Sequence, residues 1–299
     1  MNTFPERAPI TVRVPLGPKI FFKEVYRRYN RDMLADTAGA LSYYFVFALF
    51  PFLFLLTTLT AYVPYFRTSA DTILSRARDI LPPQAMRLVY AHVEGLVATP
   101  RPRFLAMSLL LALYSASRGV DAFRAALNRA HGVEESRPLW KTEALALGMT
   151  ASGTLLVLGA VSGMAAGGSA GFWLAGHVGV GARYVLVWRW LRWPVTAGAI
   201  ALCAALGYHL LPDGHRRFKL LTPGALLGTL ACFLATWGLS EYAAHIGSYN
   251  ITYGAIGGVI VLMTWFYLTG FIFLLGGEVN VILESARRHA RDEQSAPRQ

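Results

Sequence analysis

Residues 222–284 read TPGALLGTLACFLATWGLSEYAAHIGSYNITYGAIGGVIVLMTWFYLTGFIFLLGGEVNVILE. They contain two apolar runs, residues 223–244 and 253–283, which are separated by a short polar link. Each run is long enough to cross a hydrocarbon core about 30 Å thick, because such a crossing takes about 20 helical residues. The pattern therefore predicts a helical hairpin that spans a membrane.

The composition of the whole chain agrees with that hairpin. Of its 299 residues, 55% are hydrophobic and only 15% are charged, whereas a soluble domain carries about 25% charged residues. The net charge is +11, but the basic residues gather in the loops and tails between apolar runs. That distribution is typical of a protein oriented in a membrane. We therefore expect membrane lipid as a partner and no nucleic acid.

Four further apolar runs bring the predicted number of transmembrane helices to six. They cover residues 38–63, 104–116, 144–166 and 191–211. Pro51 is expected to kink the first run or break its hydrogen bonds. The run at 144–166 is rich in Gly, Ala and Ser, which allow close helix packing. Residues 64–103 predict a helical loop outside the cytoplasm, so the expected fold class is an all-α polytopic membrane protein.

The distribution of Lys and Arg predicts the orientation. One side of the membrane receives seven in the N-terminal segment, five between Arg118 and Lys141, three between Arg216 and Lys219, and four in the C-terminal tail. Since short basic loops stay in the cytoplasm, both termini are expected there. We divide the chain into a basic amphipathic segment (1–37) on the inner leaflet, a six-helix transmembrane domain (38–284) and a disordered tail (285–299).

Polar residues near the predicted cytoplasmic ends of the helices form the first candidate site, a substrate pathway or polar cluster. Its members are Asp36, Arg118, Arg124, Asn128, Glu278 and Asn280. A carboxylate at the depth of Glu278 is costly unless it is paired, and Arg118 is the expected partner. Two interpretations stay open: a structural ion pair between two helices, or a gated cavity or proton-linked site. Asp36 could also act simply as a helix cap.

A second candidate pair lies near the outer face. Glu241 and His245 are four residues apart on one predicted helical face and could titrate together. Further positions are expected to serve as hinges or packing contacts, including two GxxxG spacings. These positions are Pro51, Gly224, Gly228, Tyr249, Tyr253, Gly254 and Gly258.

The sequence carries none of the usual catalytic or metal-binding motifs. It has no HExxH, GxSxG or P-loop, and its seven histidines are dispersed. The two cysteines, Cys203 and Cys232, lie inside apolar runs and have neither a metal-binding nor a disulfide pattern. We therefore expect no cofactor, no metal site and no enzymatic activity.

Several segments resemble the YihY/BrkB family of bacterial inner-membrane proteins. They include AGALSYYFVFALFP after Asp36, YSASRGVDAFRAALNRAHG, and most of residues 222–284. The matching positions are Asp36, Pro51, Arg118, Asn128, Pro223, Gly224, Tyr249, Tyr253, Gly254, Trp265, Gly276 and Glu278. The resemblance implies six spans in the bacterial cytoplasmic membrane and links to envelope integrity, virulence or export. The family's older label of ribonuclease BN fits this sequence poorly.

The sequence leaves three functional hypotheses. The first is a transporter or exporter of a lipid or amphiphilic solute through a cavity between the helices. The second is a structural or scaffold protein whose basic N-terminal helix recruits partners. A membrane-associated ribonuclease ranks last. The GxxxG faces would serve pairing in a homo-oligomer or packing inside a monomer equally well.

Overall fold

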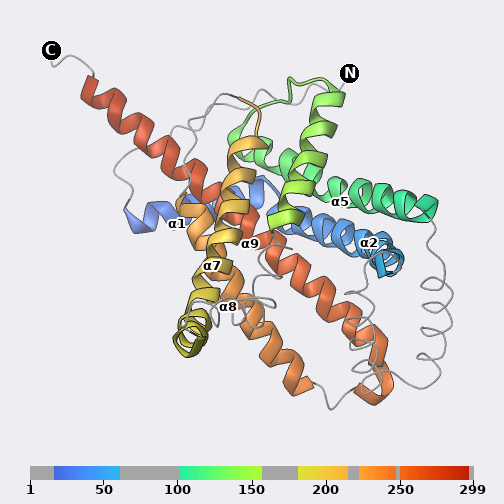
Figure 1. Ribbon diagram of the computed structural model, residues 1–299. Helices are drawn as coiled ribbons and strands as arrows, with labels where there is room; N and C mark the ends of the chain where they lie inside the picture. The colour runs from blue at the N-terminus through green and yellow to red at the C-terminus, as the bar shows by residue number, and fades with distance from the viewer. Residues whose placement is uncertain (1–16, 61–101, 157–180, 215–221, 247–249, 296–299) are drawn as a thin grey trace. The chain divides into compact units, whose positions relative to one another are not determined.

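The structure is a computed structural model that describes residues 17–60, 102–156, 181–214, 222–246 and 250–295 (Figure 1). Within these ranges every regular element is a helix. The helices are α1 (Pro18–Arg31), α2 (Leu34–Thr60), α5 (Pro102–His131), α7 (Gly181–Leu210), α8 (Pro223–Ile246) and α9 (Asn250–Ser295), and residues 139–156 are also helical. The predicted all-α class is confirmed for this part of the chain.

Four of the described helices are long and apolar enough to cross a membrane. The candidate spans are Leu34–Leu55 in α2, Trp190–Leu210 in α7, Pro223–Tyr242 in α8 and Gly258–Arg288 in α9. They match four of the six predicted runs. The helix α2 continues through Pro51, as neighbouring helices and side chains permit inside a membrane protein.

The remaining two predicted spans are not among these four. Residues 104–116 form the first part of α5, whose second part carries charged residues such as Arg118, Asp121 and Arg124. Residues 144–156 are helical, and the rest of that predicted span lies outside the described residues. The predicted helices between residues 64 and 101 lie outside them as well. Six spans therefore stay a prediction.

The structure shows where the helices at the two ends of the chain stop, and one of these ends differs from expectation. The N-terminal helix α1 stops at Arg31, where the Asp32 N–H donates to the Arg28 carbonyl and Met33 takes a positive φ of 48°. At the other end, α9 runs on to Ser295. Residues 285–295 are therefore helical where we expected a disordered tail, because the helix that leaves the span is simply continued by residues such as Ala286 that favour it.

The chain divides into two compact units. One consists of residues 44–118, and the other combines residues 1–43 with residues 119–299. Inside the smaller unit, the rings of Phe54 in α2 and Phe104 in α5 meet edge to face with centroids 6.4 Å apart. The guanidinium carbon of Arg118 lies 5.0 Å from the centre of the Tyr114 ring.

The larger unit has a small apolar core made by several helices. Its buried members are Leu127 of α5, Ala205 and Tyr208 of α7, Leu211 and Ala225. Phe123, the helical segment 139–156 and Phe273 of α9 pack against them. This core brings the end of α5 against α7, α8 and α9.

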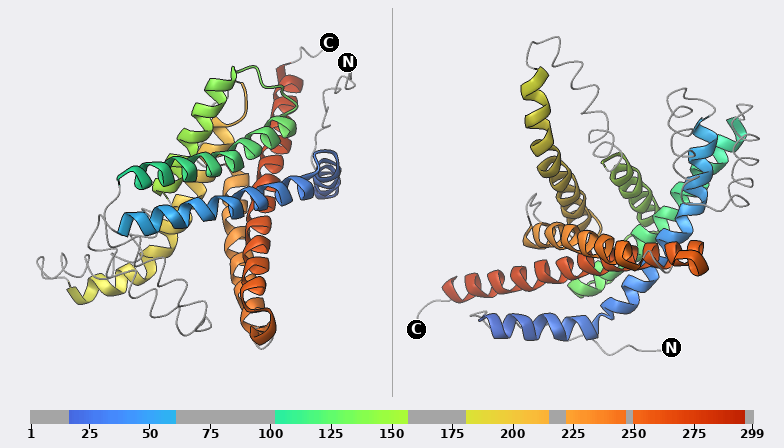
Figure 2. Two further views of the ribbon diagram at one scale, coloured as in Figure 1. Left: turned by 90° about the vertical axis from the view of Figure 1, so that its right-hand side faces the viewer. Right: turned by 90° about the horizontal axis from the view of Figure 1, so that it is seen from below.

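Two glycines let α8 and α9 approach to backbone contact (Figure 2). A Cβ added to Gly224 would lie 2.0 Å from the carbonyl oxygen of Gly276, and one added to Gly276 would lie 2.7 Å from that of Gly224. Tyr208 of α7 closes the crossing by donating its hydroxyl to the Phe273 carbonyl at 2.6 Å. The crossing agrees with the predicted packing role of Gly224. At Gly258, by contrast, an added Cβ would meet no atom within 4 Å, so no close packing is seen there.

Candidate functional site

The most buried charged residues of the described chain meet where α1 packs against α9. Glu278 of α9 is 1% exposed and Arg28 of α1 is 2% exposed. Arg28 donates from Nη1 to Glu278 Oε2 at 3.1 Å and to the carbonyl oxygen of Ala130 in α5 at 3.1 Å. Its Nε donates to Glu24 Oε1 at 3.0 Å. One guanidinium therefore joins α1, α5 and α9.

A third acidic residue, Asp32, completes the charge cluster, which we define as Glu24, Arg28, Arg31, Asp32 and Glu278. Asp32, in the link between α1 and α2, is 3% exposed. It accepts from Arg31 Nε with both carboxylate oxygens, at 3.0 and 3.1 Å. The cluster thus places three acidic groups beside Arg28 and Arg31, and the more exposed Arg27 also bonds Glu24.

One atom of the cluster lacks a donor. Among the described residues, Oε1 of Glu278 is buried and accepts no hydrogen bond from any N–H or O–H. Buried polar atoms are nearly always bonded, so an exception of this kind calls for an explanation. The cost is largest for a charged oxygen in surroundings of low dielectric constant.

Asn280 has a different role from its neighbour Glu278. Its Oδ1 accepts from the backbone N–H of Gly224 at 2.7 Å, and its Nδ2 donates to Thr222 Oγ1 at 3.2 Å. Thr222 Oγ1 also accepts from the N–H of Ala225. The first N–H groups of a helix have no partner within it. Asn280 and Thr222 therefore cap α8 and hold its start against α9.

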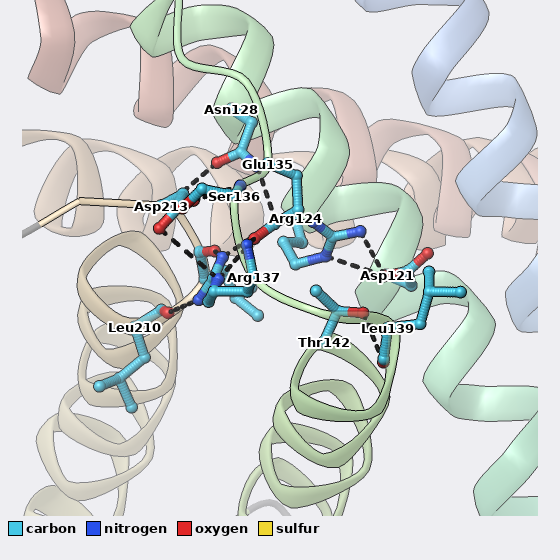
Figure 3. A network of polar contacts seen from close by, with 11 residues as sticks. Asp121, Arg124, Asn128, Glu135, Ser136, Arg137, Leu139, Thr142, Leu210 and Asp213 are labelled. Carbon is cyan, nitrogen blue, oxygen red and sulfur yellow. Dashed lines mark hydrogen bonds and ion pairs between the residues drawn. The ribbon is translucent and has the colours of Figure 1, made fainter.

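Arg124 and Asn128 belong to a separate polar network at the end of α5 (Figure 3). Arg124 bridges Asp121 of its own helix, at 2.8 Å, and Glu135 of the following link. Asn128 donates to Glu135 at 3.0 Å and accepts from the N–H of Asp213, after α7, at 2.8 Å. The network connects the end of α5 to the end of α7.

Arg137 and Asp213 extend the network. Arg137 donates to both oxygens of Glu135, at 2.6 and 3.1 Å, and to the carbonyl oxygen of Leu211 at 2.7 Å. Asp213 accepts from the hydroxyl and the N–H of Ser136, at 2.6 and 2.7 Å. These bonds from Ser136, with the nearby charge of Arg137, hold the pKa of Asp213 below its usual value. Its carboxylate therefore stays ionised down to acidic pH.

The structure does not bring the predicted polar residues into one site. Glu278 lies in the charge cluster, Asn280 caps α8, and Arg124 with Asn128 joins α5 to α7. Asp36 is exposed in the first turn of α2. We expected Arg118 to pair with Glu278; the residue that fills this role is Arg28, and Arg118 lies over Tyr114.

Several predicted positions fall where less can be said. Glu241 is exposed on α8, and the side chain of His245 lies outside the described residues. The side chains of Tyr249 and Tyr253 and the surroundings of Gly254 also lie outside the described residues. Gly228 is closely packed, since a Cβ there would lie 3.3 Å from the Phe273 ring.

Sequence reasoning missed the residues that complete both networks. They are Glu24, Arg28, Asp32, Glu135, Arg137 and Asp213. One signal was present: Glu24 and Arg28 are four residues apart on an otherwise basic helix, a spacing that favours an ion pair. In the described ranges, no group of three or more His, Cys, Asp or Glu side chains is placed to hold a metal ion.

These features define the class of the protein. Apolar helices of spanning length, with the buried charged residues of the described ranges held in ion pairs and networks, are typical of an integral membrane protein. The family model described as virulence factor BrkB matches residues 25–299. The chain therefore belongs to the BrkB family, as its sequence motifs indicated.

Individual relatives agree with this assignment. YfkH of Bacillus subtilis, whose name describes it as ribonuclease-like, is 31% identical over 268 residues, which are 90% of this chain and 96% of that protein. A UPF0761 membrane protein of Alteromonas mediterranea is 25% identical, over 91% of this chain and 90% of its own. One from Xanthomonas campestris is 24% identical, and the chain covers 59% of it. No solved structure matches the chain.

Proposed function

We propose that this chain is a six-span protein of the bacterial cytoplasmic membrane that transports a lipid or an amphiphilic solute. The observation that carries the proposal is the charge cluster around Glu278. An apolar helix of spanning length places a carboxylate there, and one of its oxygens accepts no hydrogen bond from the part of the chain that the structure describes. Because an ionisable group in a membrane helix is expensive to keep, such groups usually mark the path of a substrate or an ion.

The packing of the larger unit supports this function. The N-terminal half of α8 is held to α9 by backbone contact and by the cap at Asn280. Further along the same two helices, Trp265 Nε1 donates to Thr236 Oγ1 at 3.1 Å. Substrate sites of transporters commonly lie near the middle of the bilayer, between packed helices.

A structural function is the second candidate. Arg28 binds Glu24, Ala130 and Glu278 at once, so the cluster also fastens the N-terminal helix to α5 and α9. In that case the protein would be a scaffold, and the exposed basic residues of α1 would face anionic lipid or a partner. A ribonuclease function rests only on the name of one relative and ranks last.

The transport proposal is tested by native mass spectrometry of the whole chain, extracted with its surrounding membrane and then stripped of loosely held lipid. We expect a discrete lipid or solute adduct that survives stripping and is lost in Glu278→Gln. The matched control is Glu284→Gln, which removes a partly exposed carboxylate bonded to Arg288 on the same helix. The control should keep the adduct.

The same experiment separates the two candidates. Protein that sheds all lipid in a continuous series, with no retained adduct in the unaltered chain, would favour the scaffold. A lower unfolding temperature of Glu278→Gln without any change in adducts would point the same way.

A further inference from the structure

We propose that a phospholipid with an anionic head group binds along α1 and the adjoining part of α9. Its phosphate lies at Lys19 and Lys23, and one acyl chain follows a row of aromatic rings from α1 onto α9. The inference concerns a lipid bound at the surface of these helices, and it does not depend on whether the protein transports anything.

The three arginines of α1 bind acidic groups of the protein itself, whereas its two lysines do not. The arginine pairs are Arg27 and Arg28 with Glu24, Arg28 with Glu278, and Arg31 with Asp32. Glu24 is the one acidic residue within α1. Lys19 and Lys23 are exposed, and neither forms an ion pair in the described part of the chain. They therefore leave two uncompensated positive charges on the exposed side of this helix.

Two exposed aromatic residues lie beside these lysines. Phe22 and Tyr26 are 69% and 68% exposed. Each follows one of the lysines by three residues, and residues three or four apart are neighbours on a helix surface. Lys19, Phe22, Lys23 and Tyr26 thus form one exposed patch. Aromatic rings beside lysines are typical of a helix that lies at a membrane surface.

The rings continue from this patch onto the apolar part of α9. The Tyr26 ring stacks on that of Tyr29, with centroids 6.3 Å apart. Tyr29 meets Phe271 of α9 edge to face at 6.0 Å, and Phe271 stacks on Tyr267 at 6.3 Å. These four residues, which we call the aromatic row, lead away from Glu278 along a helix of spanning length. The row therefore connects the two lysines with a surface that suits an acyl chain.

An anionic phospholipid matches both parts of this surface. Lysine ammonium groups bind phosphate, and two of them without a counter-charge favour a head group with a net negative charge. They would repel the ammonium group of a zwitterionic lipid. An acidic segment of a soluble protein would match the lysines as well. It would not match the aromatic row, which continues along a candidate membrane span.

The test compares two lipids that have identical acyl chains and different head groups. Phosphatidylglycerol and phosphatidylcholine are titrated into the full chain, delipidated in detergent, and native mass spectrometry measures each bound fraction. We expect the unaltered protein to bind phosphatidylglycerol more tightly. Lys19→Gln combined with Lys23→Gln should weaken phosphatidylglycerol about thirtyfold, the effect of losing two basic residues near a membrane surface. Binding of phosphatidylcholine should hardly change.

Matched variants separate the head-group contact from the acyl-chain contact. Lys141→Gln removes an exposed lysine beside Trp140, outside the patch, and should weaken neither lipid. Tyr26→Ala removes the exposed end of the aromatic row and should weaken both lipids to the same extent. Trp237→Ala removes an equally exposed ring from α8 and should weaken neither.

Three results would contradict the proposal. Equal affinity of the unaltered protein for the two lipids would overturn the head-group site and favour an acidic protein segment at the lysines. An equal loss in Lys141→Gln would reduce the effect to net charge. No loss in Tyr26→Ala would overturn the acyl-chain contact. Phosphatidylglycerol binding should persist in Glu278→Gln, which distinguishes this lipid from a transported solute.

Discussion

Arg28 and Glu278 are 250 residues apart in the chain, yet they form an ion pair in which both side chains are nearly inaccessible to solvent. Removing one charge of a buried pair leaves the second one uncompensated. We expect Arg28→Met to lower the free energy of unfolding by about 3–5 kcal/mol, the usual cost of breaking a buried ion pair. Thermal unfolding in detergent measures this loss.

The double variant Arg28→Met with Glu278→Leu provides the control. Replacing both members by apolar side chains of similar size removes the uncompensated charge. Most of the lost stability should therefore return. Losses that simply add in the double variant would show that the two residues do not act as a pair.

Gly224 predicts a second effect of a single residue. An alanine Cβ at this position would overlap the Gly276 carbonyl, since the two atoms would be 2.0 Å apart. Gly224→Ala should cost about 1–3 kcal/mol or more, because α8 must move away from α9. The unfolding temperature and the yield of folded protein report it.

Gly238 is the matched control on the same helix. A Cβ there meets nothing within 4 Å. Gly238→Ala should leave stability unchanged or raise it slightly, since alanine favours a helix more than glycine does. Equal losses at the two glycines would mean that helix propensity, and not the crossing, sets the effect.

Single residues were the hardest feature to predict from the sequence. The sequence indicates which apolar segments are buried in a membrane protein. It does not distinguish Arg28 from the other basic residues of a helix that is expected to face lipid. Arg118 is the partner that the sequence favours for Glu278, because Arg118 follows an apolar run. The partner of Glu278 depends on which face of α1 meets α9, and a helix of this length offers several such faces.

At the scale of elements, Asp213 follows the end of α7 and accepts hydrogen bonds from Ser136 in the link after α5. Because its pKa is lowered in the folded protein, Asp213 stabilises the fold above the unfolded-state pKa of about 4. That contribution is lost as the pH falls through the lower folded-state value. The difference in unfolding temperature between the unaltered protein and Asp213→Asn should therefore shrink on acidification.

Ser136→Ala tests the cause of this pH dependence. It removes the hydroxyl that donates to Asp213 but keeps the backbone N–H donor. Its pH dependence should be intermediate between those of the unaltered protein and Asp213→Asn. Parallel curves for all three proteins would exclude Asp213 as the titrating group.

The exposed side of α1 predicts binding to anionic lipid. Lys19, Lys23 and Arg27 are exposed, together with Phe22 and Tyr26 at 69% and 68%. Basic residues near a membrane surface contribute about 1 kcal/mol each to binding anionic lipid. Replacing the three basic residues by glutamine should reduce the anionic lipid retained by the purified protein, whereas Asn30→Ala should not.

Apolar elements were the easiest feature to predict. Four predicted runs correspond to α2, α7, α8 and α9, because length and hydrophobicity are properties of a continuous segment. The starts and ends were harder. The predicted run at 191–211 lies within a helix that already begins at Gly181, since nothing in WRWLRW interrupts a helix at the edge of the membrane.

At the scale of the whole molecule, the number of spans decides the side on which Glu134 lies. If the N-terminus is cytoplasmic, six spans place this exposed residue on the cytoplasmic side, whereas the four candidate spans alone place it on the outer side. In a chain with Cys203 and Cys232 replaced, we expect Glu134→Cys to be protected in intact cells from a thiol reagent that cannot cross the membrane.

Ser248→Cys provides the positive control. It lies between the last two spans and faces outward in both topologies, so it should be labelled. Labelling of both cysteines to the same extent would refute the six-span arrangement.

The length of α9 has a mechanical consequence. Its 46 residues measure about 69 Å along the axis, more than twice the thickness of the hydrocarbon core. A helix of this length cannot lie wholly within the hydrocarbon core, so if its apolar part crosses the bilayer its ends project into water. Any tilt of its apolar part would displace Ser295 further than the span itself, so a molecule bound at that end would restrain the position of the span.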